Sequence, residues 1–507
     1  MTTPSEPASA QTSPSLTSPG QTSPAETSPR AVAIIARKEL VESLRDGRFR
    51  ALAVSVLALL IAGLVAGSLE TRQARQAIDS ARAADHDTWV GQGPRNPHSA
   101  AHFGHYAFKP RPVLSALDRG VDAYLGRVVW LEAHWQDPFS LRPAEDRTAL
   151  QRFGDLSAAF TLQVLAPLLV IFLGFAAFAG ERERGTLRQL VSLGLEARTL
   201  ALGKALGLGA ALALVLVPAA ILGVAVAVVT GGGAAASSWV DAALLVVVYS
   251  VYFAILLGLV LAVSASAKSA RGALVVLLGF WMLSTLIVPR LVADAAEKRY
   301  PIPTPRAFYS AIAEDEARGM GDLGSRAERR QKLEQQVLAE HGVETLEALP
   351  VNFAGLSLQA SEEHSNLVYD KHYGELWRLY LGQERAHLWG AALSPMLAVR
   401  ALSMAVAGTD VARHRHFARA AESHRRELVK FLNDDMTYNA GDAAFGYLAD
   451  EGLWRASPTF EYQPPGLGQV LGRQLPALAW LALWLVIALA VAVRAVGRLQ
   501  PLPGVSS

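Results

Sequence analysis

Three histidines, His98, His102 and His105, have the type and spacing that could hold a metal ion. They would share one face of a helix, and three imidazoles can bind zinc or copper. Prolines on both sides of the segment oppose a helix there. We therefore predict no bound metal and interpret these residues as a solvated structural cluster, with the metal site as the alternative.

Three common catalytic motifs are absent from the sequence. No Gly-x-x-x-x-Gly-Lys-Ser/Thr loop is present, and Gly203-Lys204 lacks both the upstream glycine and the following hydroxyl. His-Glu-x-x-His and Gly-x-Ser-x-Gly, which mark metalloproteases and serine hydrolases, do not occur either. The sequence therefore predicts a protein that is not an enzyme and binds no cofactor of its own.

A charged stretch from Ala179 to Leu190 lies between two apolar runs. Ionised groups in hydrocarbon are costly, so these charges must face water or another protein. Gly185 relaxes the backbone, and Thr186 can serve as the N-cap of a short helix. We expect Glu181 and Glu183 to stabilise the amino end of that helix and to present hydrogen-bond acceptors to a docked protein.

The composition places this chain among membrane proteins. Of its 507 residues 51% are hydrophobic and 18% are charged, which indicates membrane spans together with sizeable polar regions. The net charge is only +2 and no basic block occurs, so we predict no nucleic-acid partner. Disulfides and cysteine-based metal centres are excluded because the chain has no cysteine.

Six charge-free apolar runs have lengths near the ~20 residues that cross ~30 Å of hydrocarbon. They predict an all-α polytopic membrane protein with six transmembrane helices and a mainly helical extracytoplasmic domain. Because these runs contain no Asp, Glu, Lys or Arg, an energy source applied from the cytoplasm fits better than an ion gradient. The predicted spans are 51–69, 157–180, 205–229, 242–263, 272–289 and 475–493.

Lys and Arg residues in the short flanks all lie on one side of the membrane if each span crosses once. By the positive-inside rule that side is the cytoplasm of a multi-pass protein in the cell (inner) membrane, with both termini cytoplasmic. The predicted cytoplasmic parts are a disordered tail at 1–29, an amphipathic membrane-surface helix at 30–50 that braces the first span, the loop at 181–204 and a tail at 494–507. Two inserts, 70–156 and 290–474, are predicted to be extracytoplasmic.

The two inserts differ in their expected structure. The first is mixed, with a proline-rich stretch and a helix-like remainder containing Trp130 and Trp135, and the second is mostly helical. One segment of the second, 388–408, is apolar enough to be considered a seventh span. Arg400 and Pro395 argue against it, so we predict that it is buried in the outer domain or lies on the outer leaflet.

The charged stretch also carries a resemblance. The order of the parts around it is similar to that in the permease subunits of type-2 ABC exporters. These parts are an apolar span, Glu-Arg-Glu-x-Gly-Thr-Leu, a short segment, Gly-Lys and another apolar span. The large inserts resemble those of a subgroup with a big, uncharacterised extracytoplasmic domain. The residues that match are Glu181, Glu183, Gly185, Thr186, Leu187, Gly203 and Lys204.

This resemblance implies that the loop contains a coupling helix of this chain, which docks on a separate ABC ATPase subunit. That ATPase subunit uses the ATP. The resemblance also implies a second permease subunit, identical or related, paired within the lipid bilayer. The substrate is not specified, and the alternative is a non-transporting membrane anchor or sensor whose helical outer domain binds an extracytoplasmic partner. The residues implied in ATPase coupling are Glu181, Arg182, Glu183, Gly185, Thr186, Leu187 and Leu190.

The predicted topology can be checked by single-cysteine labelling, because the chain has no native cysteine. An impermeant maleimide added to intact cells should label Ser325→Cys and Ser423→Cys, since both lie in the second insert. Failure at both positions would contradict the topology. Labelling at position 325 without labelling at 423 would instead support a seventh span.

Overall fold

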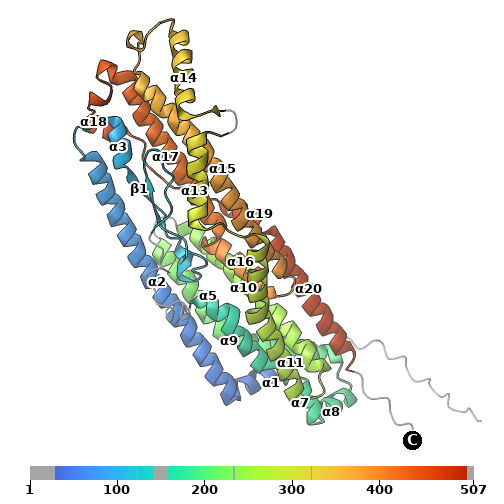
Figure 1. Ribbon diagram of the computed structural model, residues 1–507. Coiled ribbons are helices and arrows are strands. Elements are labelled where there is room, and N and C mark those ends of the chain that lie inside the picture. The colour runs from blue at the N-terminus through green and yellow to red at the C-terminus, as the bar shows by residue number, and fades with distance from the viewer. Residues whose placement is uncertain (1–28, 123, 141–156, 232–234, 321–322, 500–507) are drawn as a thin grey trace, which may run out of the picture.

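The structure, a computed structural model, describes residues 29–122, 124–140, 157–231, 235–320 and 323–499. Figure 1 shows an elongated molecule with a bundle of long helices at one end and a second group of helices at the other. We call these the bundle and the head domain. The tail predicted at 1–29 lies outside the described residues except for Pro29, and so do residues 500–507 of the predicted C-terminal tail.

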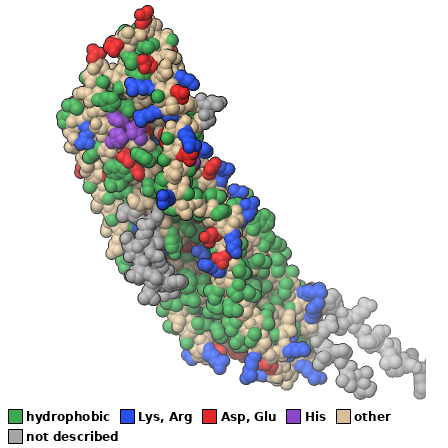
Figure 2. Space-filling model, viewed as in Figure 1, with side chains coloured by type: hydrophobic (Ala, Val, Ile, Leu, Met, Phe, Trp, Pro, Cys, Tyr) green, Lys and Arg blue, Asp and Glu red, His purple; other side chains and the backbone are tan. Residues whose placement is uncertain are grey.

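Within the described residues, six helical segments are long and apolar enough to cross a membrane, which confirms the predicted fold class. Exposed apolar side chains cover a broad area of the bundle on the face that Figure 2 shows, with Lys and Arg gathered below it. The segments are α2 (Gly47–Val90), α5 with η2, α6 and α7 (Ala158–Glu183), α9 (Ala197–Gly231), α10 (Ala235–Ser266), α11 with η4 and α12 (Ala270–Arg299), and α20 (Leu475–Gly497).

Helix α2 continues far beyond the first predicted span. Asp46 is its N-cap and accepts a hydrogen bond from the Arg48 N–H at 2.8 Å, and the helix runs 44 residues to Val90. At 1.5 Å per residue it is about 66 Å long, roughly twice the hydrocarbon thickness. The segment after Leu69 is rich in Ala, Arg and Gln, which favour helix, so the first part of insert 70–156 extends the span.

Two spans are interrupted by π-helical turns. The second contains η2 (Thr161–Leu165) before α6 (Ala166–Gly174), and the fifth contains η4 (Leu283–Ile287) between α11 (Ala270–Met282) and α12 (Val288–Arg299). The Trp281 indole N–H donates to the Val164 carbonyl at 2.9 Å and so links the two spans near these turns. A π turn leaves local carbonyls poorly paired, and here one of them receives a side-chain donor.

The predicted surface helix corresponds to α1 (Pro29–Arg45), which packs chiefly along α9 rather than along the first span. Two glycines of α9 allow this close approach: a Cβ at Gly203 would lie 2.6 Å from the Ile35 side chain, and one at Gly207 would lie 2.5 Å from the Ala36 carbonyl oxygen. The expected bracing of span one is therefore mainly a contact with span three.

Helices α15 (Phe353–Gly390) and α17 (Val411–Asn439) form the core of the head domain and pack against each other. The upper half of α2 lies along this domain in Figure 1. The remaining elements are α3 (Pro97–Phe103), β1 (His105–Phe108), η1 (Val113–Ala116), β2 (Val128–Leu131), α13 (Pro305–Arg318), α14 (Arg326–His341), η6 (Leu346–Ala348), α16 (Pro395–Ala407), η7 (Gly441–Gly446), α18 (Glu451–Ala456) and α19 (Leu467–Arg473).

Around Trp130, the first insert forms a small antiparallel sheet in place of the expected helix. Strand β1 pairs with β2, with Tyr106 opposite Trp130 and Ala107 opposite Val129. The prediction was wrong at Trp130 because the run Val-Val-Trp-Leu is β-branched and aromatic, which favours strand. Trp135 follows the sheet and is 57% exposed.

Segment 388–408 does not form one continuous helix long enough to cross a membrane. Helix α15 ends at Gly390, and α16 has only 13 residues, about 20 Å in length. Met396, Ala398 and Leu402 are buried where α16 packs against α10 and α20. The apolarity of this segment therefore reflects burial against the upper ends of the spans.

Among the glycines that the structure describes, Gly67 of α2 leaves the least room for a Cβ atom. A Cβ there would lie 2.0 Å from the backbone oxygen of Ala116 in η1, whereas a Cβ at Gly279 in α11 would meet nothing within 4 Å. We expect Gly67→Ala to destabilise the protein by about 1–3 kcal/mol, because the helix or η1 must shift. Gly279→Ala should be neutral or stabilising by up to about 1 kcal/mol.

Thermal unfolding of the purified protein in detergent, followed by tryptophan fluorescence, measures both effects. Equal unfolding temperatures for the two variants would contradict the close contact between η1 and α2.

Candidate functional site

The charged stretch forms two short helices at one end of the bundle, α7 (Ala179–Glu183) and α8 (Thr186–Ser192), labelled at the bottom of Figure 1. Gly185 separates them with a φ of 76°, in the left-handed region that favours glycine. The N-cap of α8 is Gly185 and not Thr186. The Thr186 hydroxyl instead donates to the Glu181 carbonyl at 3.2 Å, which closes the turn between the helices.

Glu181 is buried, contrary to the expectation that it faces a docked protein. Lys204 of α9 donates to Glu181 Oε1 at 2.8 Å and to Glu39 Oε1 of α1 at 2.7 Å. Lys38 Nζ also lies 3.3 Å from Glu181 Oε1. Lys204 is 1% exposed and Glu181 is 4% exposed, so a buried ionic cluster joins α1, α7 and α9.

Arg182 and Glu183 close the turn between α10 and α11. The Arg182 guanidinium donates to the carbonyls of Ala265, at 2.6 Å, and Ala267. Glu183 accepts a hydrogen bond from the Ala270 N–H at 3.1 Å. A cation at the carboxyl end of one helix and an anion at the amino end of the next both match the helix dipoles. These two residues therefore fix the second span to the fourth and fifth.

The exposed side of α8 is basic and apolar. Leu187 is buried and Leu190 is half-buried, so both pack into the bundle. Arg188 and Gln189 are exposed, and Leu193 just after the helix is 80% exposed. Leu187, Leu190 and Leu193 recur every three residues, so the sequence pattern groups Leu193 with the buried leucines, and only the structure shows that Leu193 is exposed.

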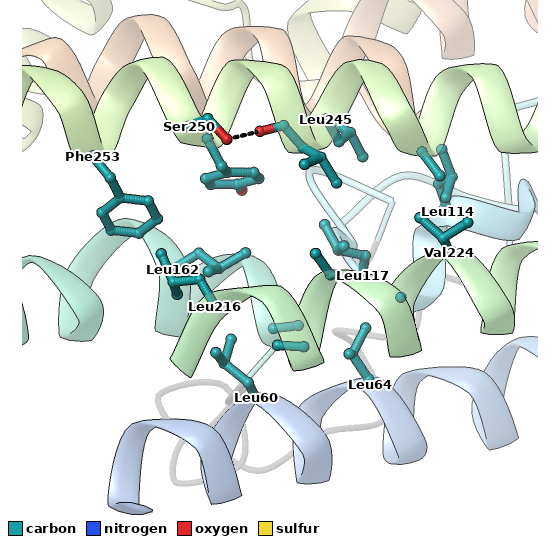
Figure 3. Close-up of a pocket in the computed structure, with 17 residues that line it drawn as sticks. Leu60, Leu64, Leu114, Leu117, Leu162, Leu216, Val224, Leu245, Ser250 and Phe253 are labelled. Atoms are coloured by element: carbon teal, nitrogen blue, oxygen red, sulfur yellow. Dashed lines mark hydrogen bonds between the residues drawn. The ribbon is translucent and has the colours of Figure 1, made fainter. Parts of the chain in front are cut away.

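A cavity of about 90 Å³ lies inside the bundle. No Asp, Glu, Lys, Arg or His lines it, and apart from the hydroxyls of Tyr249 and Ser250 its lining side chains are apolar. Most of the lining side chains come from the first four spans, and Figure 3 labels Leu60, Leu64, Leu162, Leu216, Leu245 and Phe253 among them.

Hydrogen-bonded polar groups lie beside the cavity, where the bundle meets the head domain. Tyr249 Oη is 2.9 Å from Gln163 Nε2 and 2.9 Å from Ser403 Oγ. Ser403 donates to the carboxylate of Asp118 at 2.5 Å. Burial raises the pKa of the Asp118 carboxyl, while its hydrogen bonds from Ser403 and Gly120 lower it. The network joins the second and fourth spans to α16 and to the segment after η1.

The three predicted histidines do not form one cluster. His98 and His102 lie together on α3, but the helix ends at Phe103 and His105 begins strand β1. His105 Nδ1 instead lies 3.6 Å from Asp85 Oδ2, and its ring packs against Trp89. The glycine at position 104, with a φ of 57°, turns the chain out of the helix.

A family model described as a domain of unknown function (DUF3526) matches residues 312–463. The match begins within α13 and includes α14 to α18, so it covers much of the head domain. No curated protein matches the chain.

Substitutions in the ionic cluster should lower the free energy of unfolding by different amounts, according to the charges that they leave behind. Lys204→Met leaves the neighbouring carboxylates of Glu39 and Glu181 with only the half-exposed Lys38 to balance them and should cost about 3–5 kcal/mol. Glu181→Gln leaves Lys204 its bond to Glu39 and should cost about 1.5–3 kcal/mol. Exposed Arg188→Gln should change stability by less than about 0.5 kcal/mol.

Denaturant unfolding of the detergent-solubilised variants checks this order. The triple variant Glu39→Gln, Glu181→Gln, Lys204→Met should be more stable than Lys204→Met alone, because it leaves no unpaired charge. A triple variant less stable than Lys204→Met would contradict the ionic account of the cluster.

Proposed function

We propose that this chain is the membrane subunit of an ATP-driven ABC exporter, paired with a second permease subunit and docked on a separate ATPase subunit. The observation that carries the proposal is the exposed basic and apolar face of α8. It lies at the end of the second span, and buried ion pairs connect its base to other helices. The chain contains no phosphate-binding loop, so the partner supplies the nucleotide hydrolysis.

Contacts around α8 define how a push from the ATPase would travel. Leu187 packs into the bundle, so a displacement of α8 would also displace the residues around it. The Glu181–Lys204 pair connects the turn between α7 and α8 to α9 and α1. The hydrogen bonds of Arg182 and Glu183 connect the same turn to α10 and α11. Displacement of α8 would therefore move four helices together. Helices α9 and α10 also line the apolar cavity.

The cavity suits an apolar part of a substrate. Its volume of about 90 Å³ is smaller than the roughly 300–1,000 Å³ of sites that enclose whole small molecules. In this conformation it would accept only a short acyl segment, and transport would require it to widen. An apolar lining without charges favours an amphiphile whose polar part stays outside the bundle.

The proposal includes the orientation in the cell membrane. Arg182, Arg184, Arg188 and Arg198 gather at the α8 end, and the positive-inside rule assigns that end to the cytoplasm. Both termini are then cytoplasmic, and the head domain is extracytoplasmic. The ATPase would meet α8 from the cytoplasmic side.

Docking can be tested with substitutions on the exposed face of α8. Arg188→Glu combined with Leu193→Asp should leave the protein folded, because both side chains are exposed, but should reduce co-purified ATPase subunit by about tenfold or more. Affinity purification from the source cell, with mass spectrometry and ATP hydrolysis assays, measures the loss. Leu448→Asp is the matched control, since Leu448 is 60% exposed but lies in the head domain.

Two results would contradict the proposal. One is full ATPase association and substrate-stimulated hydrolysis by the α8 variant. The other is ATP hydrolysis by the purified chain after every other protein has been removed. If no ATPase accompanies the wild-type chain and an extracytoplasmic protein does, the chain is a membrane anchor or sensor.

A further inference from the structure

We propose that His98, His102 and His134 form a zinc site on the head domain, independent of the transport function proposed above. Each offers one imidazole nitrogen, and the three nitrogens lie within 4.8 Å of one another. The ring centroids form a near-equilateral triangle, with separations of 4.7, 5.0 and 5.3 Å. No other group of three or more possible ligands was found in the described part of the chain.

Helix α3 supplies two of the ligands. His98 and His102 are four residues apart, which places them on the same face one turn apart. Asn96 caps the helix by accepting from the His98 N–H at 3.0 Å, and Pro97 occupies the first helical position. The Asn96 side-chain amide also donates to the Tyr447 carbonyl at 3.1 Å, so the helix is fixed to the rest of the head domain.

The third ligand comes from the bend after β2. The Ala133 N–H donates to the Ala101 carbonyl of α3 at 3.0 Å, which holds this bend against the helix. His134 has a φ of 68°, in the left-handed region that non-glycine residues rarely adopt. Such a conformation costs roughly 1–3 kcal/mol and persists where the surroundings impose it. Here it directs His134 toward α3.

Glu362 orients His134 as a carboxylate orients a zinc ligand. Its Oε1 accepts from the His134 backbone N–H at 2.8 Å and lies 2.5 Å from His134 Nδ1. With the Nδ1 proton directed at the carboxylate, the Nε2 lone pair is left for a metal. Glu362 is 3% exposed, and Arg425 Nη1 lies 3.4 Å from its other oxygen, Oε2. The carboxylate is therefore fixed in place before any metal binds.

The arrangement is close to zinc geometry and open to solvent. Zn–N bonds of about 2.0–2.1 Å at tetrahedral angles put ligand nitrogens about 3.4 Å apart. Rotation of the exposed His102 ring and the half-buried His98 and His134 rings would bring them to that separation. Phe445 packs against His98 on one side. Three protein ligands leave a fourth position for water or another ligand.

Metal binding can be measured on the full chain, purified without a polyhistidine tag and stripped with a chelator. Equilibrium dialysis against Zn²⁺, with metal analysis, should give one ion per chain. The stripped protein with Co²⁺ should show the visible bands of tetrahedral coordination. His98→Ala combined with His134→Ala should weaken Zn²⁺ binding by about 100-fold or more and abolish those bands.

A matched control is His86→Ala combined with His341→Ala, which removes two exposed histidines elsewhere and should leave binding unchanged. Glu362→Gln should weaken binding by about 10–100-fold, because it removes only the orienting carboxylate. Circular dichroism checks that each variant is folded.

The proposal is overturned if the wild type binds no Zn²⁺. It is also overturned if the double His98, His134 variant binds it as tightly as the wild type, or if Cu²⁺ alone occupies the site.

Discussion

The ammonium group of Lys204 lies between the carboxylates of Glu39 and Glu181 with only 1% of the residue exposed. Because these acids belong to α1 and α7, Lys204 of α9 joins the first helix, the second span and the third span, and Lys38 of α1 adds a second, half-exposed contact to Glu181. A buried ion pair is costly to break, since the remaining partner stays charged without water. The position of α8 depends on this cluster, because α8 follows Glu181 by only a few residues.

Arg425 in the head domain repeats the same arrangement. It is 1% exposed and contacts Glu422 of its own helix and Glu362 of α15. Its guanidinium also donates to the Glu132 carbonyl after β2, at 3.2 Å. Each end of the molecule is thus organised by a buried cation between acids. The middle of the bundle is held by apolar packing, as the hydrocarbon around it requires.

The six spans could be predicted because hydrocarbon thickness imposes a length and an apolar composition on each segment separately. The site could not be predicted in the same way. Glu39 and Lys204 are 165 positions apart, and nothing local to Glu181 indicates that it pairs with Lys204 instead of facing solvent. His134 was missed for a similar reason, since only the fold of β2 against α3 brings it to His98 and His102. Segment 388–408 left two interpretations open in the sequence because burial within a protein and burial in lipid select the same residues.

Helix α2 has a mechanical consequence. It is unbroken from Gly47 to Val90, and the backbone of η1 presses against it at Gly67. That contact divides it into arms of about 30 and 35 Å, so it can act as a lever with a fulcrum near its centre. A tilt of one degree would carry the two tips about 0.5 and 0.6 Å in opposite directions. A tilt of α2 would therefore also shift Asp85 and Trp89, near its upper end, relative to His105 of the head domain.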